Sequence, residues 1–128
     1  MADAVTARTY GTGLGEVVHL TNICDTTGES AVVKVDKSAT PAASGLLAIE
    51  KVVYNIQGFT YVLIAFDHTA NDTAVVLGPG TGTIDLTEVG GIIDPNSSGG
   101  TGDIVLTTVG NSANDTYDIT LHVKYYGT

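Results

Sequence analysis

The feature that most constrains this chain is a succession of short runs rich in β-branched and aromatic residues, each bounded by Gly, Pro, Asn, Asp or Ser. Such runs are typical of β-strands separated by turns. They span residues 16–24, 30–37, 46–57, 60–67, 73–77, 83–89, 103–109 and 116–126. Eight short strands with regular breaks predict an all-β antiparallel sandwich or a barrel, not a βαβ fold.

Alternation along each run predicts which side chains are buried, because successive residues of a strand point to opposite faces. In the last run the buried phase is Ile119, Leu121, Val123 and Tyr125. In the second run Ala31, Val33 and Val35 share one face, and Lys34 and Asp36 share the other. The run 46–57 also has apolar residues at helical spacing, but its β-branched residues favour a strand. Its phase changes midway, which predicts a bulge or a corner.

The length of 128 residues fits one domain of ordinary size. We expect the sandwich to occupy residues 16–128 as a single domain. Residues 1–15 contain Gly11, Gly13 and Gly15 and few apolar anchors. They are therefore expected to form an N-terminal arm that orders only against another molecule, or not at all.

Two segments echo each other: residues 80–90 resemble residues 100–110, and Ala-Asn-Asp-Thr occurs at 70–73 and again at 113–116. One interpretation is a duplicated unit whose matched loops bind matched ligands. The favoured interpretation is that turns reuse the same residues, since Gly supplies positive φ and Asn and Asp bond to their own backbone. Both interpretations predict equivalent strands entered through equivalent turns.

The charge balance excludes several partners. The chain has 5 Lys+Arg against 14 Asp+Glu, a formal net charge of -9. Nucleic-acid binding needs clustered cations, and an anionic membrane surface repels an acidic protein. No apolar run reaches the roughly 18–20 residues of a membrane-spanning helix, and the first residues lack the basic and apolar regions of a secretory signal. We expect folding in a cytoplasm, followed by release. Cys24, the single cysteine, is expected to fill the core.

Residues that could carry chemistry form only weak patterns, so neither an enzyme, a cofactor nor a metal is expected. The oxygen-rich loops 25–29 and 67–72 could offer ligands to Ca²⁺, but neither matches the twelve-residue calcium loop. Whether a cation sits there stays open. The three histidines lack the spacing of a zinc site. Asp67 and His68 are adjacent in a strand, so they would point to opposite faces and would not cooperate as an acid–base pair.

The closing pair Tyr125-Tyr126 places one ring on each face of the last strand. In one interpretation Tyr125 completes the core and Tyr126 covers an edge. In the other, an exposed tyrosine joins a subunit contact, where tyrosine is enriched. Tyr125 and Tyr126 are therefore the candidate subunit-interface residues.

Short segments that combine turn and strand residues lie at 18–22, 27–36, 54–59, 66–68, 90–95, 99–104 and 115–121. Together they cover roughly residues 16–126, and they resemble a small protein encoded among the head genes of tailed bacteriophages. The resemblance implies a non-enzymatic capsid decoration (cement) protein with a jelly-roll-like fold. Such proteins commonly sit as trimers on the outer head surface, over junctions between major capsid protein subunits.

The resemblance thus implies a homotrimer, the major capsid protein as partner, and a place on the virion after assembly in the host cytoplasm. No nucleic acid or membrane partner is expected, and a glycan is the less favoured ligand. In the arm, Arg8, Thr9 and Tyr10 are candidate capsid contacts. A cement protein crosslinks shell subunits, and several arms on one oligomer add avidity.

Two rival functions stay open. The first is a carbohydrate-binding or host-adhesion module, in which sugars stack on exposed aromatic side chains. Tyr61, Tyr125 and Tyr126 are its candidate residues, and the lack of tryptophan weakens it. The second is a tail or baseplate subunit, which only the position in a virion distinguishes from a head protein.

Overall fold

The computed structural model describes the backbone of residues 4–11 and 14–126 and the side chains of residues 14–126. Two 3₁₀ turns, η1 (Lys37–Ala39) and η2 (Thr87–Val89), interrupt an otherwise all-β chain. The strands are β1 (Ala4–Gly11), β2 (Gly15–Ile23), β3 (Val32–Val35), β4 (Leu46–Gln57), β5 (Tyr61–Phe66), β6 (Asp72–Leu77), β7 (Gly80–Asp85), β8 (Ile92–Ile93), β9 (Ile104–Val109) and β10 (Thr116–Tyr126).

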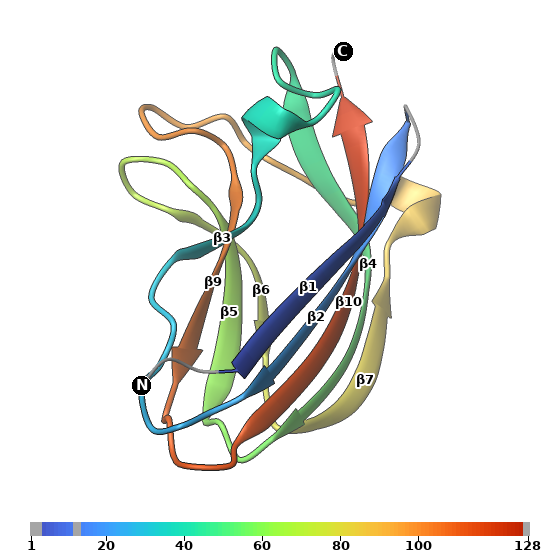
Figure 1. Cartoon of the computed structure of the whole chain (residues 1–128). Helices are drawn as coiled ribbons and strands as arrows, with labels where there is room; N and C mark the ends of the chain where they lie inside the picture. Colours follow the sequence, from blue (N-terminus) through green and yellow to red (C-terminus); the bar gives the residue numbers. More distant parts are fainter. Residues whose placement is uncertain (1–3, 12–13, 127–128) are drawn as a thin grey trace.

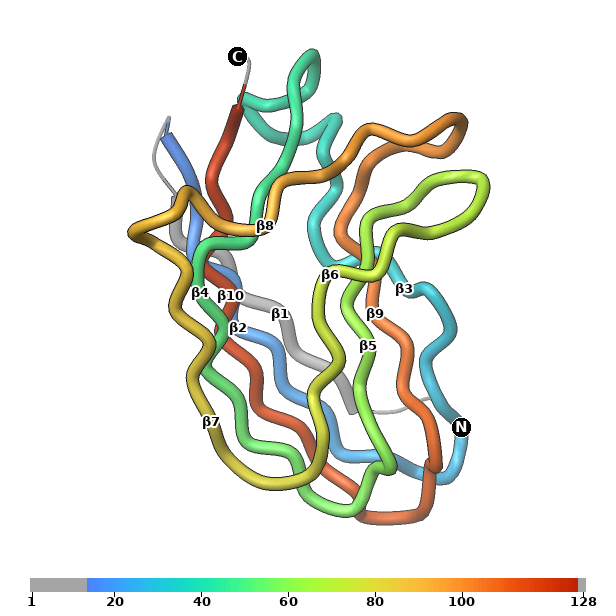
Figure 2. The backbone as a smooth tube through the Cα atoms, turned by 180° about the vertical axis from the view of Figure 1, so that it is seen from behind, coloured from blue at the N-terminus to red at the C-terminus, as the bar shows by residue number. Residues whose placement is uncertain are grey.

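The strands form two antiparallel sheets that face each other (Figure 1). One sheet has the order β1-β2-β10-β4-β7, with β8 paired to β4, and the other has the order β3-β9-β5-β6. The pairs β2–β10, β3–β9, β4–β7 and β5–β6 are nested in sequence, so the chain follows the path of one long hairpin folded over itself (Figure 2). With β1 and β8 set aside, this is the strand arrangement of a jelly roll. The expected jelly-roll-like sandwich is confirmed.

The core lies between the two sheets and follows the alternation of the strands. Ile119, Leu121, Val123 and Tyr125 of β10 are all buried, as their shared phase predicts, and Cys24 is buried with them. Full burial of a valine, leucine or isoleucine side chain stabilises a fold by about 1.5–3 kcal/mol. Phe59 and Tyr117 pack with ring centroids 6.1 Å apart.

Strand β4 confirms both the predicted extent and the predicted change of phase. It runs over residues 46–57, and its pairing with β10 shifts where Val123 lies opposite Ile49 and His122 opposite Lys51. Glu50 is the extra residue of this bulge. The bulge moves the buried phase from Leu47 and Ile49 to Val52 and Ile56, because one added residue reverses every following side chain.

The second predicted run differs from the structure. Its pairing with β9 shifts between Val33 and Val35, so Lys34 is an extra residue, its side chain is buried, and Val33 is exposed. A bulge therefore reverses the faces that strict alternation assigned to Lys34 and Val33. The run 83–89 also differs, because β7 occupies residues 80–85 and η2 follows it.

The two similar segments, residues 80–90 and 100–110, do not form equivalent strands. Residues 80–85 form β7 at the edge of one sheet, whereas the corresponding residues 100–105 form a turn and only the start of β9, inside the other sheet. The two segments do share a positive φ at their closing glycines, Gly90 and Gly110. The sequence similarity therefore reflects turn residues that recur in different structural surroundings.

The expected arm over residues 1–15 contains a strand. Ala4–Gly11 pair along their whole length with β2 of the same chain, as the edge strand of their sheet. Pairing needs only backbone hydrogen bonds, which the side of β2 supplies without apolar anchors. No helix in the described part of the chain is long and apolar enough to cross a membrane.

Candidate functional site

The outer face of the β3-β9-β5-β6 sheet has no charged side chain among its strand residues. Alternation and cross-strand pairing place on it the residues that we call the uncharged face: Val33, Tyr61, Leu63, Ala65, Thr73, Val76, Val105, Thr107 and Val109. Its central residues Ala65 and Val105 are buried, but Val33 and Val76 near its two edges are 49% and 56% exposed. An uncharged, partly apolar surface on an acidic protein is a candidate contact surface.

The outer face of the other sheet is different in character. It carries titratable side chains on its central strands and on β7, and we call it the charged face: His19, Lys51, Asp85, Asp118, His122 and Lys124. His19 Nε2 and Asp118 Oδ1 are 2.7 Å apart, and both side chains are exposed. Val53, 40% exposed, lies among these residues as an isolated apolar side chain. This face favours solvent rather than a dry contact.

The predicted subunit-interface residues have separate positions in the single chain. Tyr125 belongs to the core, and burial, followed by the charge of Glu16, raises the pKa of its hydroxyl. Tyr126 is half-buried: its hydroxyl donates to the Gly90 carbonyl, and Lys124 Nζ lies 5.0 Å from its ring centroid. Tyr126 thus contacts the residue that ends η2 within one chain, and its role in a subunit contact stays a prediction. The side chains of Arg8, Thr9 and Tyr10 lie outside the described residues.

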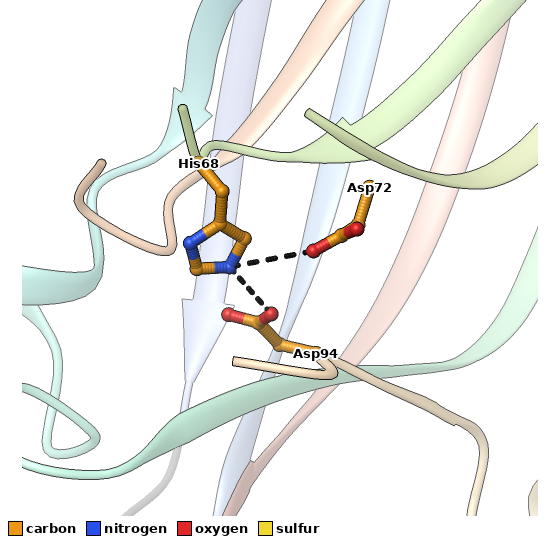
Figure 3. A group of neighbouring side chains, drawn as sticks. All are labelled: His68, Asp72 and Asp94. Carbon is orange, nitrogen blue, oxygen red and sulfur yellow. Dashed lines mark hydrogen bonds and ion pairs between the residues drawn. The ribbon is translucent and has the colours of Figure 1, made fainter. Parts of the chain in front are cut away.

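A buried polar group, which we call the His68 cluster, consists of His68, Asp72 and Asp94 (Figure 3). It joins the β5–β6 loop to the segment that follows β8. His68 Nε2 lies 2.6 Å from Asp94 Oδ1 and 3.8 Å from Asp72 Oδ2. The other ring nitrogen, Nδ1, lies 2.8 Å from the Gly99 carbonyl oxygen. A carbonyl and a carboxylate both accept hydrogen bonds, so this geometry favours donation from both ring nitrogens and the imidazolium form.

The electrostatics of the His68 cluster agree with a protonated ring. Burial alone lowers the pKa of His68, but the hydrogen bonds to Gly99 and Asp94 and the charges of Asp94 and Asp72 outweigh it and raise the pKa. The three side chains offer one nitrogen and two carboxylate oxygens within 4.8 Å, a set that could hold a divalent cation. Asp72 Oδ2 and Asp94 Oδ2 are buried and accept no hydrogen bond from the described residues, while Asp94 Oδ1 and the Gly99 carbonyl hold the ring, so the cluster links the β5–β6 loop to the segment after β8.

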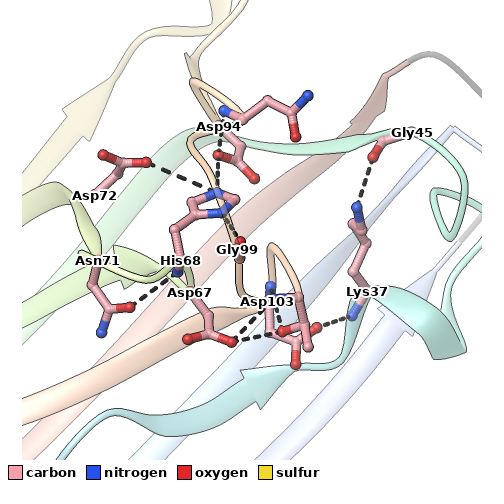
Figure 4. Close-up of polar contacts among 11 residues, drawn as sticks. Lys37, Gly45, Asp67, His68, Asn71, Asp72, Asp94, Gly99 and Asp103 are labelled. Atoms are coloured by element: carbon pink, nitrogen blue, oxygen red, sulfur yellow. Dashed lines mark hydrogen bonds and ion pairs between the residues drawn. The ribbon is translucent and has the colours of Figure 1, made fainter.

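Further hydrogen bonds fix the loops around this cluster (Figure 4). The backbone N–H of His68 donates to Asn71 Oδ1, and Asp67 Oδ2 accepts from the hydroxyl of Thr101. Asp67 and His68 lie in the loop after β5, which ends at Phe66, and not in a strand as the sequence predicts, and they bond to different partners. On the far side, Lys37 Nζ donates to the Gly45 carbonyl at 2.9 Å.

A second buried polar group, which we call the Glu29 cluster, consists of Asn22, Glu29, Lys34 and Tyr117. Glu29 Oε2 pairs with Lys34 Nζ, while Oε1 accepts from Asn22 Nδ2 at 3.1 Å and from the Tyr117 hydroxyl. Asn22 and Tyr117 are cross-strand partners on β2 and β10. One carboxylate thus receives donors from both sheets.

Sequence reasoning missed both clusters. One signal was available, because Asn22 follows Val18 and Leu20 on the buried phase of β2, where a polar residue needs a buried partner. The burial of Lys34 depends on the bulge in β3, which alternation does not reveal. Asp94 reaches His68 from 26 residues away, so neither sequence neighbourhood indicates the pair. No family model, curated protein or solved structure matches the chain.

Proposed function

We propose that this chain is a non-enzymatic capsid decoration protein of a tailed bacteriophage, which binds the outer head surface and stabilises contacts between major capsid protein subunits. The observation that carries the proposal is the uncharged face on a protein with a net charge of -9. It provides one dry contact surface, while the charged face keeps the opposite side solvated. Jelly rolls occur in viral capsid proteins and in lectins, so the fold alone does not choose between them.

The edge strand β1 supports the same proposal. It lies at one border of its sheet and pairs with β2 on one side. An edge strand can add a strand from a partner through backbone hydrogen bonds. We propose that β1, which includes Arg8, Thr9 and Tyr10, contributes to the capsid contact or to a homotrimer interface.

The carbohydrate-binding alternative receives less support. Its candidate rings are divided between three environments: Tyr61 lies on the uncharged face, Tyr125 lies in the core, and Tyr126 belongs to the outer side of the other sheet. Rings on opposite sides of a sandwich cannot stack on one sugar chain. A glycan array is expected to give no hits, and specific binding would favour the adhesion function instead.

The test introduces one lysine into each face. Val33→Lys and Val76→Lys charge the uncharged face, and Val53→Lys adds the same charge at a similarly exposed valine of the charged face. Purified variants are mixed with head particles that lack the protein, and bound chain is measured by co-sedimentation. The first two variants should bind at least about tenfold more weakly, because an uncompensated charge in a dry contact costs more than the roughly 1.4 kcal/mol that a tenfold change represents.

Val53→Lys should bind as well as the wild type. Equal binding by all three variants would exclude the uncharged face as the contact, and equal weakening would indicate a general charge effect. Absence of wild-type binding to heads would contradict the decoration function itself. Cryo-EM of the virion separates head from tail, since density on the tail or baseplate would assign the chain there.

A further inference from the structure

We propose that Lys34 and Asn22 form an intramolecular isopeptide bond, with Glu29 as the residue that moves the proton. The bond would connect β3 in one sheet to β2 in the other. This inference is independent of the proposed function, because it rests only on the Glu29 cluster. Asn22 is 1% exposed, and the side chains of Lys34 and Glu29 are 5% and 7% exposed.

The geometry places the two reacting side chains on one carboxyl group. Lys34 Nζ, the nucleophile, contacts Glu29 Oε2. Asn22 Nδ2, the nitrogen that would leave, donates to Glu29 Oε1 at 3.1 Å. The Tyr117 hydroxyl also donates to Oε1 and so orients the carboxyl group from the strand next to Asn22.

The reaction needs the neutral amine of Lys34, and the contact between Nζ and Glu29 Oε2 provides an acceptor for its proton. An ammonium and a carboxylate in an apolar interior both lose hydration, so transfer of one proton from Nζ to Oε2 removes two buried charges. The product of this transfer is a neutral amine, which is the nucleophilic form of lysine. Glu29 then carries the proton that the leaving group needs.

The reaction balances without any other reactant. The lone pair of neutral Nζ attacks Cγ of Asn22 and forms the new C–N bond. Glu29 donates a proton to Nδ2, the bond between Cγ and Nδ2 breaks, and ammonia leaves. The remaining extra proton on Nζ passes to the carboxylate and then to the departing ammonia, so ammonium is released and Glu29 ends as it began.

A free lysine and a free asparagine do not react at a useful rate, but holding the two side chains close together accelerates the reaction between them. Two groups held in one pocket react with effective molarities of up to about 10⁵–10⁸ M when Nζ approaches Cγ to about 3–3.5 Å. The Glu29 carboxyl group contacts both side chains, through Oε2 and Oε1, and so holds them close to each other. The bond would fasten β3, a strand of four residues at the edge of its sheet, to the longer strand β2.

The decisive measurement is the intact mass of the purified full-length chain in denaturing solvent. We expect a complete loss of one ammonia relative to the mass that the sequence predicts. A digest should contain one branched peptide that joins residue 22 to residue 34, with no tryptic cleavage after Lys34. A folded wild-type chain with its full predicted mass would overturn the proposal.

Three variants distinguish formation of this bond from other reactions that release ammonia. Lys34→Arg and Glu29→Gln should each retain the full mass while circular dichroism confirms the folded state. Lys37→Arg, at another lysine with a part-buried side chain, should lose ammonia like the wild type. An ammonia loss that persists in Lys34→Arg would indicate a cyclic imide at an asparagine and would refute the isopeptide bond.

Discussion

The His68 cluster and the Glu29 cluster both bury charged side chains, but they do so in different ways. The Glu29 cluster lies between the sheets, and three donors share one carboxylate. The His68 cluster lies between two loops, and one cationic ring bonds to a carboxylate and a carbonyl. In water a lysine keeps its proton to a far higher pH than a histidine does. The His68 cluster is therefore the one of the two that can respond to pH near neutrality.

The largest expected effect tests the contribution of the Glu29 cluster to stability. Lys34→Met removes the nitrogen that contacts Glu29, and with it the proposed bond to Asn22, and leaves the Glu29 carboxylate buried. Leaving a buried charge without its partner typically costs about 3–5 kcal/mol, and we expect a loss of at least that size in the free energy of unfolding, measured by urea denaturation.

The double variant Lys34→Met/Glu29→Gln is the control for this loss. It leaves no charge in the pocket, so much of the lost stability should return. A single-variant loss below about 1 kcal/mol would match an exposed pair rather than a buried one, and would contradict the described burial of Lys34.

The second prediction concerns the His68 cluster. Asp94→Asn retains the shape of the side chain but removes the charge that faces His68 Nε2. We expect a loss of about 1.5–3 kcal/mol in the free energy of unfolding, the usual contribution of a hydrogen bond to a charged group. This is less than for Lys34→Met, because His68 can release its proton when its partner is lost.

Asp72→Asn is the matched control in the same cluster. Asp72 lies farther from the ring, at 3.8 Å, and its side chain is 28% exposed. Thermal denaturation should show a clearly smaller change for it than for Asp94→Asn. Equal effects would indicate that general charge, and not the close hydrogen bond, stabilises the loops.

The predicted parts of the fold are those that depend on local pattern. The extent of β4 and β10, the bulge near Glu50 and the buried phase of β10 all follow from the alternation of nearby residues. Each of these features lies in a long strand at the centre of its sheet. Packing on one face there leaves a clear period of two in the sequence.

The unpredicted parts depend on contacts between distant segments. Strand β1 forms because β2 offers a free side, and its own residues show little apolar pattern. Lys34 is buried because β3 bulges against β9, and Asp94 meets His68 because the fold brings the segment after β8 against the β5–β6 loop. Alternation identifies faces, but it does not identify which side chains meet across them.

The third prediction is the pH response of the His68 cluster. Since the folded state raises the pKa of His68 above its usual 6.5, the folded chain binds more protons than the unfolded chain in this region. The stabilisation is full below pH 6.5 and is lost as pH rises through the folded-state pKa. Melting temperatures measured upward from pH 6 should fall in the wild type.

His68→Gln should lack this fall in melting temperature. Asp94 and Asp72 are the acidic groups that face the ring, and His68 is the group of the cluster whose ordinary pKa lies near this range. A slope that persists unchanged in His68→Gln would place the responsible group elsewhere in the chain.

The smallest expected effect compares this buried pair with an exposed one of the same chemistry. His19 and Asp118 are 2.7 Å apart on the charged face, almost the same separation as the 2.6 Å between His68 and Asp94. Water screens the exposed pair, so Asp118→Asn should change the free energy of unfolding by no more than about 0.2–1 kcal/mol. Urea denaturation of Asp118→Asn beside Asp94→Asn measures the contribution of burial at nearly constant distance. If the two losses were equal, distance alone would determine the strength of these pairs, and the distinction between a buried link and a solvated surface pair would be wrong.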